Sequence, residues 1–571
     1  MSELLSEFKF WIIFLVLNYL NYLVVYILHY RKSRFLPYIR NLKNKKIGLI
    51  AEGNLDFFRY SVEISFIIII SRFFDLHNFS IPLLILYFIF LIFNFYQYSF
   101  RKIYETEPII FNDLKLIKNG MAIIWHESKF KVLVGIIISI WFLFFLNKLL
   151  KVYLISNYEM PLSQSFILIS FGKFLLVVYS VYKFKKGYRD YPNDIYLRYH
   201  FTSIELFVNL VKSFDCYKLS KLKFGNNYKI ARENIDIELN DIAPNIHFIF
   251  VESYGSLFYN EKKLQIQAYK TLRDFKRKIK DKGFGAISNF SESTTTGGQS
   301  WLTYTSVLFG YRIDNNTLFE NLLNDPHFCN SNGFMQLFKK MGYTNYNLNP
   351  INPINGITVP YEAMRKMYSI DRWILNKDIQ YTGDKYGFGA AAPDQYSMNF
   401  TMDIIKKENK KPYTFFYLTK SSHSPFPKVE LVDDWRTLNH TNGSIHEHKG
   451  FLKYPSLDDY AQAINYQIMN LQRFISDSDN NDDIFIVFGD HQPPILSNPS
   501  SDGLKTPVHI ISKNHKFLNE FKAFNFVEEL SNATKSIKHE AFYSIFLRAF
   551  CKNYAKSYAN IPKYEPDGLQ F

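Results

Sequence analysis

Long apolar runs are concentrated in the first third of the chain, before about Tyr182. Five of them are candidates for transmembrane helices: Phe10–Leu28, Ser61–Phe74, Ile81–Phe95, Val132–Leu146 and Leu162–Tyr182. A helix needs about 20 apolar residues to cross a bilayer, and a soluble core does not use this many such runs in so short a stretch. We therefore predict a membrane domain of about five helices in residues 1–186. The second run is the least apolar of the five, because it contains Glu63 and Arg72.

The rest of the chain has the pattern of a water-soluble protein. Residues 187–241 are polar and charged, as expected of a juxtamembrane linker, and residues 242–571 alternate between short apolar runs and helical patterns. Four runs predict strands: His247–Val251, Phe415–Leu418, Asp483–Phe488 and Val508–Ile511. Two stretches predict helices: Phe334–Lys340 and Tyr460–Ile475. This alternation is typical of an α/β domain with a mostly parallel sheet covered by helices on both faces.

The net charge of +15 raises the question of a nucleic-acid partner. Much of the basic excess lies beside the apolar runs, between Arg31 and Lys46 and between Lys183 and Arg189. We therefore attribute it to the membrane flanks and expect no nucleic-acid binding. The three cysteines lie far apart, which excludes a Cys-x-x-Cys metal site and makes a disulfide framework a poor explanation of the fold.

Two of the predicted strands end in residues that can ligate a metal. Glu252 directly follows the run that ends at Val251, and Asp490-His491 follow the run that ends at Phe488 after one glycine. In α/β sheets, ligands bind at the carboxyl ends of the strands. Taken singly, each residue is equally well explained as a polar cap of a strand. Taken together, they favour a site for one divalent metal, with Mn²⁺ preferred and Zn²⁺ as the alternative.

The segment from Asn289 to Gly310 supplies a candidate nucleophile. It reads as a polar, glycine-containing loop running into a helix that begins near Ser300. A hydroxyl at a helix N-terminus is well placed to meet a phosphate, because the backbone N–H groups and the helix dipole favour anions. An ordinary serine N-cap is the alternative, and the loop taken alone favours it. His423 follows the Phe415 run and can contact a phosphate oxygen or protonate a leaving group.

The soluble part of the chain contains four short motifs: Phe250-Val251-Glu252-Ser253, the Gly297-Gly298-Gln299-Ser300-Trp301-Leu302 loop, Ser421-Ser422-His423-Ser424-Pro425-Phe426, and Phe488-Gly489-Asp490-His491-Gln492-Pro493-Pro494. Together they resemble the sulfatase-like branch of the alkaline phosphatase superfamily. Closest in layout are the membrane-bound lipoteichoic acid synthases and the phosphoglycerol or phosphoethanolamine transferases. The resemblance implies about five N-terminal helices followed by an extracytoplasmic catalytic domain with a bound metal.

The resemblance also implies roles for individual residues. The family's metal ligands are matched by Glu252, Asp490 and His491, and Ser300 itself would contact the metal. In the synthases the nucleophile is a threonine ten residues before a glycine, and counting back ten from Gly310 reaches Ser300. Because the residue here is a serine, Thr296 is the fallback nucleophile. His423 matches the histidine that contacts the substrate. Three further residues correspond to the region that lines the substrate cleft: Arg372, Trp373 and Asp394.

Two subclasses of the family fit this chain poorly. True sulfatases need a Cys/Ser-x-Pro-x-Arg motif, and the sequence from Ser300 has neither the proline nor the arginine. Lipid A phosphoethanolamine transferases usually carry several disulfides in the catalytic domain, which this chain cannot build. We therefore favour phosphoglycerol as the transferred group, with phosphoethanolamine as the second choice.

The predicted function is transfer of a head group from a membrane phospholipid donor to an envelope glycan or polymer, through a phospho-serine intermediate. Two alternatives stay open: a phosphodiesterase or phosphatase of the same superfamily, and an inactive scaffold of envelope assembly. The predicted location is the bacterial cytoplasmic membrane, multi-pass, with the catalytic domain outside. The charge bias disagrees, because a cytoplasmic Arg31–Lys46 loop and five spans would leave that domain inside.

Overall fold

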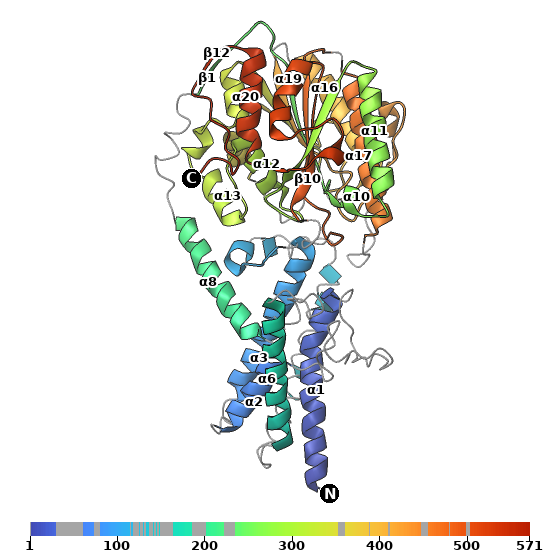
Figure 1. Ribbon diagram of the computed structural model, residues 1–571. Coiled ribbons are helices and arrows are strands. Elements are labelled where there is room, and N and C mark those ends of the chain that lie inside the picture. Colours follow the sequence, from blue (N-terminus) through green and yellow to red (C-terminus); the bar gives the residue numbers. More distant parts are fainter. Residues whose placement is uncertain are drawn as a thin grey trace. The chain divides into compact units, whose positions relative to one another are not determined.

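A computed structural model describes residues 2–29, 61–73, 80–104, 164–185, 201–221 and 235–570, together with scattered positions between 106 and 148. The last range has gaps at 352–359, 388, 409–411, 447–454, 479 and 498–502. The chain divides into two compact units (Figure 1). One comprises Met1–Lys102 and Glu107–Asp215, and the other comprises Ile103–Thr106 and Cys216–Phe571.

The first unit is helical where the structure describes it. Its principal helices are α1 (Ser2–His29), α2 (Val62–Phe73), α3 (Ser80–Tyr104), α6 (Gln164–Lys185) and the greater part of α8 (Thr202–Lys221). Phe14 of α1 packs edge-on against Phe166 of α6, with ring centroids 5.1 Å apart. The predicted apolar runs at positions 10–28, 61–74, 81–95 and 162–182 therefore fall on four of these helices.

Among the described residues, one helix, at Phe8–Ile27, is both long and apolar enough to cross a membrane. Helix α2 has 12 residues, fewer than the roughly 20 that a crossing requires. In α6 the apolar stretch is limited to Phe166–Leu175. The predicted run Val132–Leu146 lies largely outside the described residues. The count of five spans therefore stays a prediction.

The second unit is built on an eight-stranded sheet of order β11-β3-β10-β9-β2-β7-β4-β5. In that order the strands are Ile537–Lys538, Gly285–Glu292, Lys505–Ser512, Ile484–Gly489, Ile246–Val251, Tyr413–Leu418, Thr344–Asn349 and Arg372–Leu375. Strand β10 runs antiparallel to β3 and β9, and the other neighbouring pairs are parallel. The predicted mostly parallel sheet is confirmed, with one reversed strand inside it.

Helices cover both faces of this sheet (Figure 1). One face carries α12 (Ser300–Phe309), α13 (Asn316–Leu323), α14 (Phe334–Lys340), α19 (His515–Glu520) and α20 (Phe542–Tyr554). The other carries α10 (Leu257–Asn260), α11 (Gln265–Lys280), α16 (Asp394–Glu408) and α17 (Leu457–Ser476). Along β2, Phe248 and Phe250 point into the first core, whereas Ile249 and Val251 point into the second. This alternation explains why five of the six positions of the strand are apolar, the exception being His247.

Smaller elements complete the unit. Strand β1 (Asp236–Leu239) pairs with β12 (Ala555–Ala559), and β6 (Lys385–Tyr386) pairs with β8 (Ile445–His446). Short helical segments are α15 (Tyr361–Met367), η3 (Phe328–Asn330), η4 (Trp435–Leu438), η5 (Phe521–Phe524) and η6 (Leu530–Asn532).

Gly310 ends α12 in a left-handed conformation, with φ of 70°. A Cβ at this position would lie 2.6 Å from the Cβ of Tyr543, whereas a Cβ at Gly342, which also has a positive φ of 91°, would meet nothing within 4 Å. We predict that Gly310→Ala lowers the melting temperature of the detergent-purified full chain more than Gly342→Ala does. Both substitutions cost about 1–2 kcal/mol for the left-handed backbone, and only the first adds a clash. Equal losses would show that close packing against α20 does not hold this end of α12.

Candidate active site

Three adjacent parallel strands end at the same edge of the large sheet. Strand β2 lies between β9 and β7, with Val251 level with Gly489 and Phe250 level with Leu418. The residues that follow, Glu252, Asp490 and Thr419, therefore arrive side by side. The backbone N–H of Glu252 donates a hydrogen bond to Thr419 Oγ1 at 3.0 Å, which ties two of these strand ends together.

Glu252, Asp490 and His491 form a compact buried group. His491 Nε2 lies 3.3 Å from Glu252 Oε1 and 3.2 Å from Asp490 Oδ2. The candidate ligand atoms of the three residues all lie within 4.8 Å of one another. His491 Nδ1 donates a hydrogen bond to the carbonyl of Gln492 at 2.8 Å, since a carbonyl can only accept. In the neutral ring the lone pair is therefore on Nε2 and faces the carboxylates, which is the arrangement of a metal-ligating histidine.

The hydrogen bonds of Asp490 leave one oxygen facing the group. Its Oδ1 accepts from the backbone N–H of Ser253 at 2.7 Å and of His491 at 2.6 Å. Its Oδ2 is buried and, within the described part of the chain, has no hydrogen-bond donor. Two buried carboxylates and an inward lone pair are costly without a cation between them. The three residues therefore fit a divalent metal ion.

Burial and mutual repulsion shift the protonation of this group when no metal is bound. Burial alone would raise the pKa of Glu252, but the positive charges of His491, His423 and Lys420 hold it well below its usual value. Burial and the charge of Glu252 raise the pKa of Asp490. Burial would lower the pKa of His491, yet the two carboxylates raise it to about 9. A metal must therefore displace a proton from His491.

Ser300 lies at the first position of α12 and touches the whole group. Its Oγ donates to Glu252 Oε2 at 3.4 Å and lies 3.4 Å from His491 Nε2. The Ser300 side chain also lowers the pKa of the nearby Asp490 carboxyl. The N-cap is Gln299, in a left-handed conformation with φ of 61°, and it makes no side-chain cap bond. The alternative of an ordinary serine N-cap is therefore wrong.

The backbone is strained on both sides of the group. Gln299 and Ser253 have positive φ values of 61° and 60°, which residues other than glycine seldom adopt. Strain of this kind persists only where the surroundings impose it, and it clusters at functional sites. The side chain of Asn316 donates to Gln299 Oε1 at 3.2 Å and helps to hold this turn.

Thr296, the fallback nucleophile, is buried four residues before Ser300. Within the described residues, no hydrogen bond joins its hydroxyl to Glu252, Asp490 or His491. The loop that contains it is anchored by Ser293, whose Oγ donates to the carbonyl of Asp490 at 2.6 Å. The structure thus brings Ser300 rather than Thr296 to the candidate ligands.

His423 lies on the loop that follows β7. Its Nδ1 donates to the carbonyl of Ser424 at 2.7 Å, and its charge lowers the pKa of Glu252, so it is close to the group. A hydrogen bond ties the same loop to the end of β2, because Ser422 Oγ donates to the backbone carbonyl of Glu252 at 2.7 Å. The structure therefore brings His423 to the same edge of the sheet as the candidate ligands.

Asp394 has a different position from the one its predicted role requires. It is fully buried at the start of α16, where its carboxylate accepts from the backbone N–H groups of Lys420 and Ser421, each at 2.8 Å. The side chains of Tyr417 and Gln467 also donate to it. These four bonds occupy the carboxylate and leave no room for a substrate. The contact expected from sequence is corrected to a positioning role, in which Asp394 holds the loop of His423.

Arg372 and Trp373 are not brought to the group, which corrects their predicted place in the substrate cleft. They lie on β5, the edge strand, three strands away from β2. Following the register across β4 and β7, Arg372 is level with His247, five residues before Glu252. The separation is thus about 16 Å along the strands and about 14 Å across them. Arg372 instead faces Asp378 and Glu408, at 3.5 and 3.8 Å.

Lys420 was not among the residues singled out from sequence. It lies three residues before His423, and its charge interacts with Glu252, Asp394 and Asp490. Burial lowers its pKa. A lysine directly before the Ser421-Ser422-His423 motif was the available signal, but only the fold shows that it lies beside the carboxylates.

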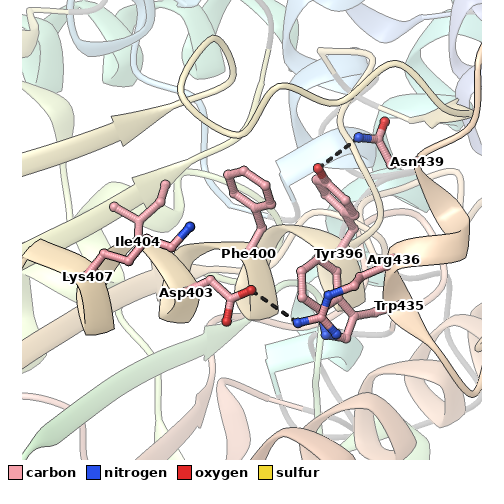
Figure 2. A pocket seen from close by; sticks show the side chains of 8 residues that line it. All are labelled: Tyr396, Phe400, Asp403, Ile404, Lys407, Trp435, Arg436 and Asn439. Atoms are coloured by element: carbon pink, nitrogen blue, oxygen red, sulfur yellow. Dashed lines mark hydrogen bonds and ion pairs between the residues drawn. The ribbon is translucent and has the colours of Figure 1, made fainter.

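A separate cavity of about 260 Å³ lies between α16 and η4 (Figure 2). Its wall includes Tyr396, Phe400 and Trp435, and the Arg436 guanidinium lies 4.3 Å from the centre of the Trp435 ring. Asp403 pairs with Arg436 at 3.3 Å. None of the predicted site residues lines this cavity.

No protein-family model and no curated protein matches the chain. Similar solved structures include the integral membrane protein lipooligosaccharide phosphoethanolamine transferase A of Neisseria meningitidis, at 11% identity over 99% of this chain and 97% of that one, with a TM-score of 0.48. A protein in the alkaline phosphatase superfamily from Vibrio parahaemolyticus matches at 14% identity over 60% and 74%, with a TM-score of 0.37. The lipoteichoic acid synthase LtaP of Listeria monocytogenes matches at 15% identity over 52% and 70%, with a TM-score of 0.31. The chain is similar to proteins of the classes that its motifs resemble.

We predict that added Mn²⁺ or Zn²⁺ stabilises the full chain more strongly as pH rises from about 6 to about 9. Because the pKa of His491 rises from its ordinary value of 6.5 to about 9 on folding, the protonated ring stabilises the metal-free fold fully below pH 6.5. This stabilisation is lost as pH rises through about 9. The metal needs the deprotonated ring, so its affinity rises over the same interval. Melting temperatures with and without metal at several pH values measure the effect. Asp490→Asn is the control, and an equal metal-induced shift in that variant would argue against the site.

Proposed function

We propose that this chain is a metal-dependent phosphotransferase in which Ser300 is the nucleophile. The observation that carries the proposal is the contact of Ser300 Oγ with Glu252, Asp490 and His491 at the start of α12. A serine that merely capped the helix would direct its hydroxyl to a backbone N–H group instead. Among the described residues, the hydroxyl is directed to the one buried group whose ligand atoms lie close enough together to hold a metal.

The first step replaces one phosphate ester bond by another. Ser300 Oγ attacks the phosphorus of a phospholipid head group, a bond from Oγ to phosphorus forms, and the bond from phosphorus to the lipid oxygen breaks. Glu252 Oε2, which accepts the hydrogen bond from Ser300, is placed to receive the serine proton. His423 is placed to give a proton to the departing lipid oxygen. A divalent ion, when bound, would stabilise the deprotonated hydroxyl and offset charge on the phosphoryl oxygens.

The elements around Ser300 suit an anionic phosphoryl group. Helix α12 is ten residues long, and its first backbone N–H groups lie beside the nucleophile, where its dipole favours negative charge. Lys420 adds a positive charge next to the carboxylates. The strained turn at Gln299 fixes the direction in which the Ser300 hydroxyl leaves the helix. These groups would hold the phosphoryl group in both steps of the transfer.

The second step transfers the phosphoryl group to the acceptor and regenerates the free Ser300 hydroxyl. A hydroxyl of an envelope glycan or of a growing glycerophosphate polymer attacks the phosphorus of the phospho-serine and gives its proton to His423. The bond from phosphorus to Ser300 Oγ breaks, and Oγ takes back the proton that Glu252 received. We propose phosphatidylglycerol as the first donor and phosphatidylethanolamine as the second, with Mn²⁺ preferred to Zn²⁺. A hydrolase of the same superfamily would differ only in using water here, and an inactive scaffold would carry out neither step. The competent residues at Glu252, Ser300, Asp490 and His491 support an enzyme over a scaffold.

The donor is a lipid, so we further propose that residues 1–186 anchor the chain in the bacterial cytoplasmic membrane. The catalytic domain, residues 242–571 in this proposal, would then work on the outer side, with 187–241 as the connection. Helix α1 supports at least one crossing.

We predict that Ser300→Ala reduces head-group transfer by at least about a thousandfold while leaving metal binding and the melting temperature close to those of the parent chain, because the attacking atom is lost and the buried ligands stay. Thr296→Ala is the matched control, and it should retain most of the activity. Turnover and metal content of the purified full chain are the measurements. The reverse pattern, an active Ser300→Ala and an inactive Thr296→Ala, would move the nucleophile to Thr296.

We predict that labelled phosphatidylglycerol, placed in the outer leaflet of intact cells that express the chain, yields label on an envelope polymer. Labelled phosphatidylethanolamine should react more slowly, and Asp490→Ala cells should transfer neither label. Chromatography of the released and polymer-bound products separates the alternatives. Label appearing only as free glycerophosphate would indicate a hydrolase, and reaction only in broken cells would place the catalytic domain inside.

A further inference from the structure

Helix α8 is apolar on its exposed side. Ile204, Phe207 and Leu210 are 55%, 67% and 52% exposed, and Val208 and Val211 are exposed beside them. At 100° per residue these five side chains fall within an arc of about 160°. The opposite side of the helix carries Thr202, Asn209 and Ser213, of which Thr202 and Asn209 are buried. A helix on the surface of a water-soluble protein has the reverse arrangement, with its polar side outward.

The polar side of α8 is fixed by specific hydrogen bonds within the first unit. Asn209 donates through Nδ2 to the carbonyl of Pro108 at 2.8 Å and accepts through Oδ1 from the backbone N–H of Ile110 at 3.0 Å. Ser213 Oγ accepts from the backbone N–H of Phe111 at 3.2 Å. These bonds set the rotation of the helix about its axis. It cannot turn its apolar side inward without leaving several buried polar groups unpaired.

The N-terminal end of α8 is held in the same orientation. Asn94 of α3 donates to Thr202 Oγ1 at 3.2 Å, and Glu63 of α2 accepts from the backbone N–H of Ser203 at 3.0 Å. Both partners lie in the first unit, as does this part of α8. The apolar arc is therefore turned outward along two full turns of the helix, from Ile204 to Val211.

We propose that the apolar side of α8, residues 204 to 211, is inserted into the hydrocarbon edge of one leaflet of the membrane. The stretch is about 12 Å long, well short of the roughly 30 Å of hydrocarbon that a spanning helix must cross. It therefore enters one leaflet and does not span the bilayer. This inference rests on the proposed membrane location of the first unit.

The end of the helix carries charges suited to the lipid head groups. Lys218 and Lys221 lie in its last turn. At 100° per residue Lys218 falls on the same side as Ile204, and long lysine side chains can lie along apolar surface while the ammonium reaches the phosphate layer. Anionic lipid head groups at this depth would pair with these cations. The lysines therefore favour a lipid surface as the occupant.

The apolar exterior continues onto neighbouring helices of the same unit. Ile85 and Ile92 of α3 are 52% and 65% exposed, and Leu168 and Phe171 of α6 are 69% and 55% exposed. Within this unit, residues such as Asn21, Asn94 and Thr202 are buried. A unit with polar residues inside and large apolar residues outside is adapted to hydrocarbon. Helix α8 shares that adaptation, although its sequence alone reads as part of a polar linker.

The test uses spin labels on the full chain in vesicles of phosphatidylcholine with a minor fraction of phosphatidylglycerol. Labels are attached at Ile204→Cys and Phe207→Cys in a background in which the three native cysteines are replaced and metal binding is retained. Ile266→Cys on α11 is the matched control, because Ile266 is an equally large apolar residue, 83% exposed, in the catalytic unit. Collision of each label with oxygen and with a water-soluble nickel complex is measured.

The expected result is a several-fold larger ratio of oxygen to nickel collisions at positions 204 and 207 than at position 266. Ratios that match the control would overturn the proposal, because the helix would then lie in water. Protection from both reagents, with magnetic broadening between labels on different chains, would also overturn it and identify a second copy as the occupant. The readout needs no turnover, so repeating it with Ser300→Ala separates failure of this inference from failure of the proposed enzyme activity.

Discussion

The pairing of β2 with β9 is the interaction on which the candidate site depends. It sets Val251 level with Gly489, and the next residue on each strand is then a carboxylate that faces the same point. Gly489 permits this close approach, since a Cβ there would lie 1.9 Å from the carbonyl of Tyr254. A slip of the register by one residue would send Glu252 or Asp490 to the opposite face of the sheet. The cores on both faces oppose such a slip, because β2 is buried along its whole length.

Burying Glu252, Asp490 and His491 together is unfavourable by itself, and the surrounding structure is arranged to hold them. Backbone N–H groups fix Asp490, the carbonyl of Gln492 fixes the His491 ring, and Ser422 ties the backbone of Glu252 to the neighbouring loop. These contacts hold the two carboxylates together despite their mutual repulsion, and they would also keep the ligands in place for a metal. Asp394 contributes indirectly, because its carboxylate holds the loop that carries Lys420 and His423.

The two units of the chain solve opposite solvation problems. In the second unit, apolar side chains fill two cores, and the candidate ligands Glu252, Asp490 and His491 lie together at one edge of the sheet. In the first unit, asparagine and threonine side chains pair with one another inside, and isoleucine, leucine and phenylalanine face outward. The proposed transferase needs both arrangements, because its donor is dissolved in a membrane and its chemistry needs a fixed polar site.

Local pattern was enough to predict the four central strands of the sheet, the start of the helix at Ser300 and the position of Glu252, Asp490 and His491 at the ends of strands. Strands buried on both faces are apolar at nearly every position, with His247 the exception in β2, and motif residues directly after a strand must lie at its end. Strand order and register are not local, and only they show that Arg372 and Trp373 lie three strands away from β2. Likewise, only tertiary contacts show that Asp394 is fully hydrogen-bonded, that Ser300 rather than Thr296 meets the ligands, and that α8 turns its apolar side outward.

The sequence by itself determined which residues can carry the chemistry, because residue type and local spacing decide which side chains can ligate a metal or attack a phosphate. The tertiary structure decided which of them meet, because that depends on how distant strands pair.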